Sequence, residues 1–151
     1  MAMALRTLTR LACVLASLSS VALVAASEGQ VTGVVRYVTD GDTFRLESGE
    51  RIRIADIDAP ETHRDQARCA QEIAKGKASA DAVRALLDHR SVRFFRLGRS
   101  YDRTVARVTL GNRDLGGLLI EMGVARPWLR GQAKPDWCAG AVRASRRRRG
   151  S

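Results

Sequence analysis

Four carboxylates lie close together in the sequence, next to two short segments with β-strand character. Asp40 and Asp42 lie in a turn before the first segment, and Asp58 and Glu61 follow the second, Arg51–Ile57. Two carboxylates about 4 Å apart repel by roughly 1–4 kcal/mol at dielectric constants between those of water and a protein surface. A shared proton or a hard cation such as Ca²⁺, which accepts carboxylates and carbonyls, would offset this repulsion. The alternative is purely structural: an acidic turn and a capped strand end.

Two arginines accompany these acids. Arg53 lies five residues before Asp58, and Arg103 directly precedes a later predicted strand. A cation and two planar guanidinium groups suit a phosphodiester that becomes more negative during reaction. Strict alternation in a strand would place Arg53 and Asp58 on opposite faces. We therefore expect a kink between Ile54 and Asp58, with Asp56 as a candidate for the break; the alternatives for Asp56 are a surface residue or a further acid near the cation.

Three motifs carry a family resemblance. DGDTF (Asp40–Phe44), RIADIDAPE (Arg53–Glu61) and YDRTVA (Tyr101–Ala106) resemble, in order and spacing, the signature blocks of the thermonuclease or staphylococcal nuclease-like family. The resemblance covers roughly residues 31–126, and three ordered blocks are far more specific than DGDT alone. It points to a secreted bacterial member of the family.

The resemblance implies a metal site and a water-handling acid. By position, Asp42, Asp58 and the backbone carbonyl of Ala59 would hold the metal. Ala59 stands where threonine is more familiar, a change that a backbone ligand tolerates. Glu61 would position or deprotonate the attacking water. The implied ion is Ca²⁺, with Mg²⁺ and Mn²⁺ left open.

The resemblance also assigns roles to the arginines and to one aromatic residue. Arg53 and Arg103 would bind the scissile phosphate and neutralise its transition state. Tyr101 would lie near the nucleotide; the alternative is a half-buried tyrosine at the barrel edge. Asp102 replaces the family's usual glycine. It either pairs with Arg103 and weakens its hold on phosphate, or points to solvent.

The implied function is that of a Ca²⁺-dependent endonuclease that hydrolyses DNA and RNA with little sequence preference and leaves 3′-phosphate ends. The alternative is a non-catalytic nucleic-acid-binding module with an OB fold. A pure binder has no need of carboxylates that repel phosphate, so the complete set of acids and arginines favours the enzyme. No stable protein partner is implied, and we expect a monomer.

The amino terminus predicts a secretory leader. Arg6 and Arg10 precede an apolar run without charge, Leu11–Ala26, which ends in small residues. The run is short for a membrane span, which needs about 20 residues; an uncleaved anchor is the alternative. We expect cleavage near Ala26, a secreted or periplasmic protein, a nuclease domain over residues 27–130, and a C-terminal segment with a basic tail over 131–151.

Charge and cysteine content fit this location. The formal net charge is +10, and loss of the leader removes two arginines from it, which still favours anionic partners. Cys13 leaves with the leader, so Cys69 and Cys138 remain as an even pair in an oxidising compartment. This predicts a disulfide, worth roughly 4 kcal/mol for a loop of this length; the alternative is two free thiols. Trp128 and Trp137 are interpreted as packing residues of the C-terminal segment.

Hydrophobic periodicity predicts an α+β, mainly β, fold with five strands and two to three helices. A helical stripe that includes Gly76 predicts close packing at that glycine. Barrel closure, into a five-stranded OB-fold-type barrel, is taken from the resemblance and from the preference of small sheets to remove their edges. The expected strands are 31–38, 44–47, 51–57, 92–97 and 104–110, with a turn at 98–100, and the expected helices are 67–89, 115–122 and 139–149.

Overall fold

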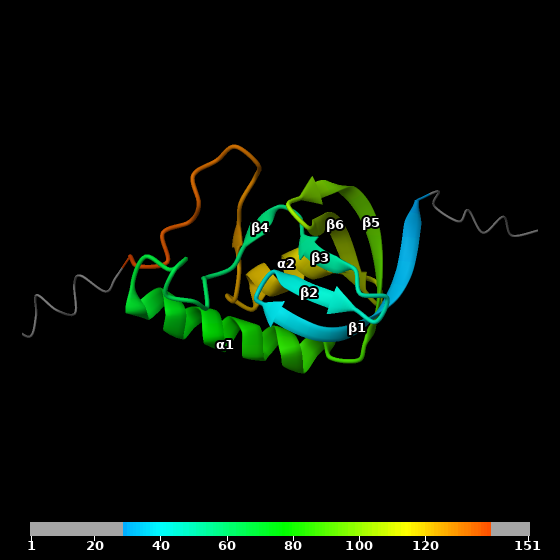
Figure 1. Ribbon diagram of the computed structural model, residues 1–151, viewed down its shortest axis with the longest axis horizontal. Coiled ribbons are helices and arrows are strands. Elements are labelled where there is room, and N and C mark those ends of the chain that lie inside the picture. Colours follow the sequence, from blue (N-terminus) through cyan, green and yellow to red (C-terminus); the bar gives the residue numbers. More distant parts are fainter. Residues whose placement is uncertain (1–28, 140–151) are drawn as a thin grey trace, which may run out of the picture.

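A computed structural model of the chain describes residues 29–139 (Figure 1). The predicted leader, the basic tail and the predicted helix over 139–149 lie outside the described residues, apart from residue 139 itself. The elements in chain order are β1 (Gln30–Asp40), β2 (Thr43–Leu46), β3 (Arg51–Ile54), β4 (Ile57–Asp58), α1 (Ala70–Leu87), β5 (Ser91–Ser100), β6 (Arg103–Leu110), β7 (Arg113–Asp114), α2 (Leu115–Glu121) and β8 (Arg126–Pro127).

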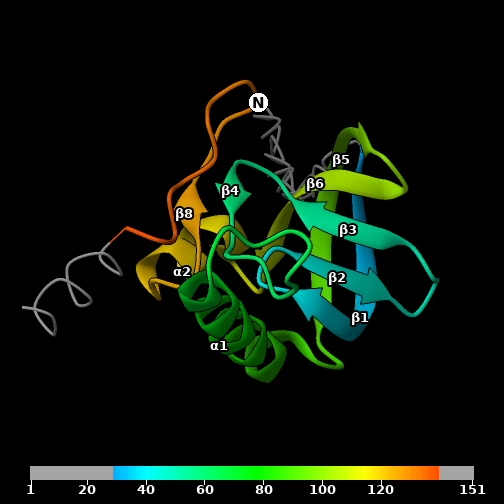
Figure 2. The same ribbon diagram turned by 60° about the vertical axis from the view of Figure 1, so that its left-hand side comes forward.

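Five strands close into a barrel. Antiparallel pairs give the order β3-β2-β1-β5-β6, and β3 then pairs with β6 in parallel, with Arg53 opposite Val105. This last pairing closes the sheet and removes its edges, which confirms the predicted five-stranded, OB-fold-type barrel. The short strands β4 and β8 pair with each other beside the barrel (Figure 2).

Alternating apolar residues fill the barrel. The inward positions of β2, β3 and β6 include Phe44, Ile52 and Val108, each without exposed surface. Val83 and Leu87 of α1 pack against this core from outside the sheet. The alternation seen in the sequence therefore has the expected cause, which is one buried face on each strand.

The strand predicted over 51–57 is interrupted, as the alternation argument required. β3 ends at Ile54, Asp56 adopts a left-handed backbone with φ 61°, and β4 begins at Ile57. The side chain of Asp56 is about half exposed and lies 3.8 Å from Arg107. Asp56 is therefore both the break and a surface residue, and the kink turns Asp58 toward Arg53.

The turn predicted at 98–100 is wrong. β5 continues to Ser100, and the chain reverses at Tyr101 and Asp102, where Tyr101 has φ 56°. Gly98 instead follows a register shift between β5 and β6, so it marks a bulge rather than a turn.

The two helices begin at side-chain caps. α1 starts at Ala70, three residues later than expected, because the sulfur of Cys69 accepts a hydrogen bond from the backbone N–H of Glu72. α2 starts where expected, with the carboxylate of Asp114 accepting from Gly117 N at 2.7 Å. Neither helix of the described residues is long and apolar enough to cross a membrane.

Gly76 brings α1 against the segment that carries the candidate acids. A Cβ atom at this position would lie 2.4 Å from the carbonyl oxygen of Glu61 and 2.7 Å from that of Pro60. The close packing predicted from the helical stripe is confirmed, and its partner is backbone that cannot rotate away.

We predict that Gly76→Ala lowers the free energy of unfolding by about 1–3 kcal/mol, because overpacking outweighs the gain in helix propensity. The exposed position Ala78 of the same helix provides the matched control: Ala78→Gly should cost only the propensity difference of about 1 kcal/mol. Denaturant unfolding measures both. A more stable Gly76→Ala variant would contradict the close contact.

Candidate functional site

A cleft of about 630 Å³ opens at one end of the barrel. It collects side chains from the β1–β2 turn, from β3, from the segment after β4, from the β5–β6 turn and from the segment after β8. Among the predicted site residues, those that line it are Asp42, Arg53, Ala59, Glu61, Tyr101 and Arg103. Asp58 does not line the cleft and is buried, with 2% of its surface exposed.

Asp42 is a buried carboxylate with several partners. Its Oδ1 accepts from Thr43 Oγ1 at 2.8 Å, and its Oδ2 lies 2.6 Å from Arg53 Nη1. The turn that presents it is held by Asp40, whose Oδ1 accepts from Asp42 N at 3.1 Å. Burial raises the pKa of Asp42 to about 7, although the nearby Arg53 lowers it. One guanidinium is therefore too little positive charge to keep this acid readily ionised.

Asp58 approaches the same guanidinium from the other side of the kink. Its Oδ1 lies 3.9 Å from Arg53 Nη2, which also donates to the carbonyl of Ile57 at 3.3 Å. Asp42, from the β1–β2 turn, and Asp58, from β4, thus converge on Arg53.

Glu61 has a cationic partner that sequence reasoning missed. Lys134 Nζ lies 2.8 Å from Glu61 Oε1 and 3.3 Å from Asp58 Oδ1. Burial alone would lower the pKa of Lys134, but the hydrogen bond to Glu61 and the charge of Asp58 together raise it. The lysine is 73 positions from Glu61, in a segment without a recognisable motif, so no local sequence signal could have found it.

Arg103 and Tyr101 stand at the open side of the cleft. Among the described residues, no carboxylate lies within 4.0 Å of the Arg103 guanidinium, so this cation is available to a phosphate. Tyr101 is 92% exposed, which makes the alternative of a half-buried edge tyrosine wrong. Asp102 does not pair with Arg103. Its side chain is 65% exposed, as the solvent-facing alternative expected, and it forms an ion pair with Arg51 that lowers the pKa of Asp102.

The chain matches a family model described as Staphylococcal nuclease homologue over residues 51–148, more than half of its length. The chain belongs to the staphylococcal nuclease family. Members of this family are generally nucleases, and the matched range takes in Arg53, Asp58, Glu61 and Arg103. Comparison with curated proteins found no match.

The acids of this nuclease-family chain fit a hard cation. Asp58 Oδ1 is buried and accepts no hydrogen bond, and its nearest cation is the partly exposed ammonium of Lys134 at 3.3 Å. Burial raises the pKa of Asp42 although Arg53 lies beside it, so the two carboxylates can accept further positive charge. All candidate donors are oxygens, as Ca²⁺, Mg²⁺ and Mn²⁺ prefer. The residues that would hold the ion are Asp42, Asp58 and the carbonyl of Ala59.

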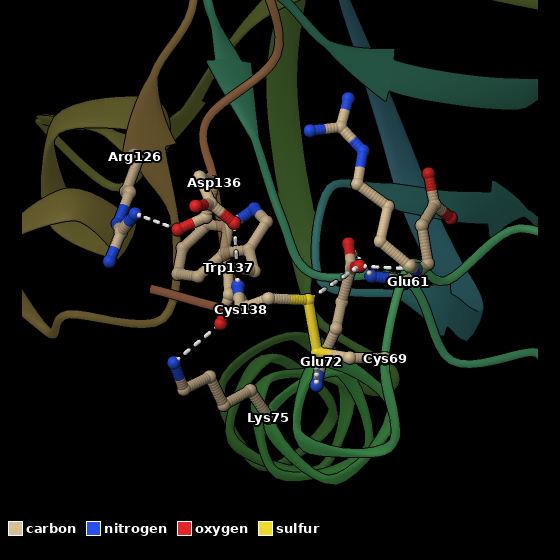
Figure 3. The surroundings of a disulfide bond; sticks show 9 residues. Glu61, Cys69, Glu72, Lys75, Arg126, Asp136, Trp137 and Cys138 are labelled. Carbon is tan, nitrogen blue, oxygen red and sulfur yellow. Dashed lines mark hydrogen bonds between the residues drawn. A yellow bond between two sulfur atoms is a disulfide. The ribbon is translucent and has the colours of Figure 1, made fainter. Parts of the chain in front are cut away.

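A second group of metal-binding residue types does not fit. Within residues 29–139, the ligand atoms of Cys69, Glu72 and Cys138 lie within 4.8 Å of one another. The two cysteines are joined in the disulfide that their count predicts (Figure 3). They therefore offer no thiolate to a metal. Glu72 instead accepts from Arg68 N at 2.7 Å and supports the loop that leads from Glu61 to α1.

The two tryptophans of this nuclease-family site do more than pack the C-terminal segment. Trp137 is 5% exposed, and its Nε1 donates to Asp58 Oδ2 at 2.9 Å. The ring of Trp128 lies under Arg53, 5.5 Å from the guanidinium carbon to the ring centre. These contacts orient the Asp58 carboxylate and the Arg53 guanidinium. Both tryptophans belong to the segment that follows β8, so the path of that segment determines both contacts.

We predict that Trp137→Phe lowers the free energy of unfolding by about 1–3 kcal/mol, because it leaves a buried, charged acceptor without its donor. Trp128→Phe is the matched control, since the Trp128 indole donates to the carbonyl of Gln132 in an exposed setting. That change should cost less than about 1 kcal/mol. If chemical denaturation showed that both variants lose the same free energy of unfolding, the hydrogen bond to Asp58 would contribute no more to stability than the exposed one.

Proposed function

We propose that this protein is a metal-dependent endonuclease that hydrolyses phosphodiester bonds in DNA and RNA, with Ca²⁺ as its working ion. One observation carries the proposal: two buried carboxylates, one from the β1–β2 turn and one from β4, converge on one guanidinium beside a cleft that Glu61 and Arg103 line. A module that only binds nucleic acid would gain nothing from an acidic centre that repels phosphate. Family membership supports the same reaction class.

Within the proposal, each side chain has a defined task. Asp42 and Asp58, with the carbonyl of Ala59, hold the ion, which when bound supplies positive charge that polarises the phosphate. Glu61 accepts a proton from the attacking water, or orients that water, in line with the bond to be broken. The bond from phosphorus to the 5′-oxygen breaks, which leaves a 3′-phosphate end.

The arginines neutralise charge that grows in the transition state. Arg103 has a guanidinium open to the cleft and is placed to contact the phosphate directly. Arg53 is only 12% exposed and already contacts both carboxylates, so its positive charge acts on the phosphate and on the acids together. A planar fork suits both tasks better than an ammonium group.

Location and assembly are part of the proposal. We propose a secreted or periplasmic monomer whose substrates are DNA and RNA. The Cys69–Cys138 disulfide supports an oxidising compartment, because such bonds rarely persist in a reducing cytoplasm.

Metal dependence can be tested by digestion of plasmid DNA and of RNA. We expect cleavage with Ca²⁺, none with a chelator, and recovery when Ca²⁺ is restored in excess. Parallel reactions with Mg²⁺ and Mn²⁺ identify the working ion. Full activity in the presence of chelator would contradict a metal-dependent reaction.

Two substitutions test the chemical roles. We expect Glu61→Gln and Arg103→Gly each to lower kcat by about 10²–10⁴-fold, because they remove proton transfer and transition-state charge stabilisation. Glu121→Gln on α2 and Arg107→Gly on β6 make the same chemical changes outside the cleft and should leave kcat within about twofold. Thermal unfolding checks that each variant is folded. Near-normal rates for both site variants would refute the assignment.

A further inference from the structure

The segment from Leu129 to Asp136 is an arch whose two ends are fixed beside the candidate site. It rises after β8 and returns toward the start of α1, as the orange trace in Figure 1 shows. At the first end, β8 pairs with β4 through the backbone, with Arg126 opposite Asp58 in the antiparallel register. At the second end, the Cys69–Cys138 disulfide ties the chain to α1.

Several contacts reinforce the second end of this arch. Lys75 Nζ donates to the carbonyl of Trp137 at 2.7 Å (Figure 3). The guanidinium of Arg126 donates to the carbonyl of Asp136 at 2.9 Å and lies 4.2 Å from the centre of the Trp137 ring. These contacts fix the second end of the arch beside α1 and β8.

We propose that Lys134, carried by this arch, is a tethered cation that is held by Glu61 and competes with a divalent metal ion for Asp58. The inference rests on the proposed function, because it concerns the same carboxylates. The ammonium lies 2.8 Å from Glu61 and 3.3 Å from Asp58, between the acid assigned to the metal and the acid assigned to water.

Lys134 and a metal ion cannot both be close to Asp58 Oδ1. A divalent ion held by that oxygen would face the ammonium at a distance at which like charges repel strongly. Metal binding therefore requires the lysine to withdraw from Asp58. Its side chain is 40% exposed and has a flexible four-carbon stem, so it can move toward solvent while the arch stays in place.

The same cation explains the spacing of the acids. Asp42, Asp58 and Glu61 do not gather as closely as the group at the disulfide, in which all ligand atoms lie within 4.8 Å. Arg53 contacts the first two, and Lys134 contacts the last two. Side-chain cations thus supply the positive charge of the site, and an incoming ion has to replace one of them.

Calorimetric titration of the full-length, oxidised protein with Ca²⁺ at constant ionic strength tests the proposal without reference to activity. We expect Lys134→Met to bind Ca²⁺ about three- to tenfold more tightly than the unchanged protein, because a competing ion pair is gone. Lys77→Met, which removes the same charge from an exposed position of α1, should change the affinity less than twofold.

Three results would contradict the proposal in distinguishable ways. Equal affinity of Lys134→Met and the unchanged protein would overturn the competition and leave the proposed metal site intact. Weaker binding by Lys134→Met would also overturn it, and would make the lysine a supporting element of the site. Absence of Ca²⁺ binding in all three proteins would overturn the proposed metal site together with this inference.

The role of the arch is tested by the paired change Cys69→Ser and Cys138→Ser. Freeing one end should raise Ca²⁺ affinity when Lys134 is present and should have no further effect in the Lys134→Met background. Circular dichroism verifies that the variants are folded. An equal gain in both backgrounds would show that the disulfide acts on the site independently of Lys134.

Discussion

The structure depends on holding two carboxylates, Asp42 and Asp58, out of water and within reach of one guanidinium. Both are at most 4% exposed, and burying a charge without a partner is costly. The charge of Arg53 offsets part of this free-energy cost. Burial nevertheless outweighs the arginine and raises the pKa of Asp42 to about 7. Arg53 therefore does not fully balance the buried acids, and the proposed chemistry brings a divalent cation to them in place of Lys134.

The barrel supplies the geometry that this charge arrangement needs. The parallel pairing of β3 with β6 fixes Arg53, and the left-handed backbone at Asp56 redirects the chain so that Asp58 faces the arginine. Gly76 allows α1 to approach the backbone that follows, at Glu61. The segment after β8 completes the site with Trp137 and the arch. Trp137 and Lys134, both far away in the sequence, thus contact Asp58 and Glu61.

Much of the fold followed from local sequence patterns, whereas the completion of the site did not. Alternation located the five barrel strands but not the two-residue strands β7 and β8. The conflict between alternation and a shared site for Arg53 and Asp58 predicted the kink. By contrast, Trp137 reaches Asp58 across 79 positions, a contact without local periodicity. The partner of Asp102 is Arg51, which lies beside it only because β3 and β6 close the barrel. Contacts that depend on closure or on a crosslinked segment are set by tertiary structure and leave no short-range signal.

The most direct measurement is anomalous diffraction from crystals soaked in Mn²⁺, an ion with the same preference for oxygen ligands that can be located by its own scattering. A single strong peak bounded by the carboxylates of Asp42 and Asp58 and the carbonyl of Ala59 is the expected result. The Lys134 ammonium should then have withdrawn from Asp58. A peak elsewhere, or no peak between these two acids in crystals that diffract well, would contradict the convergence of both carboxylates on one metal ion.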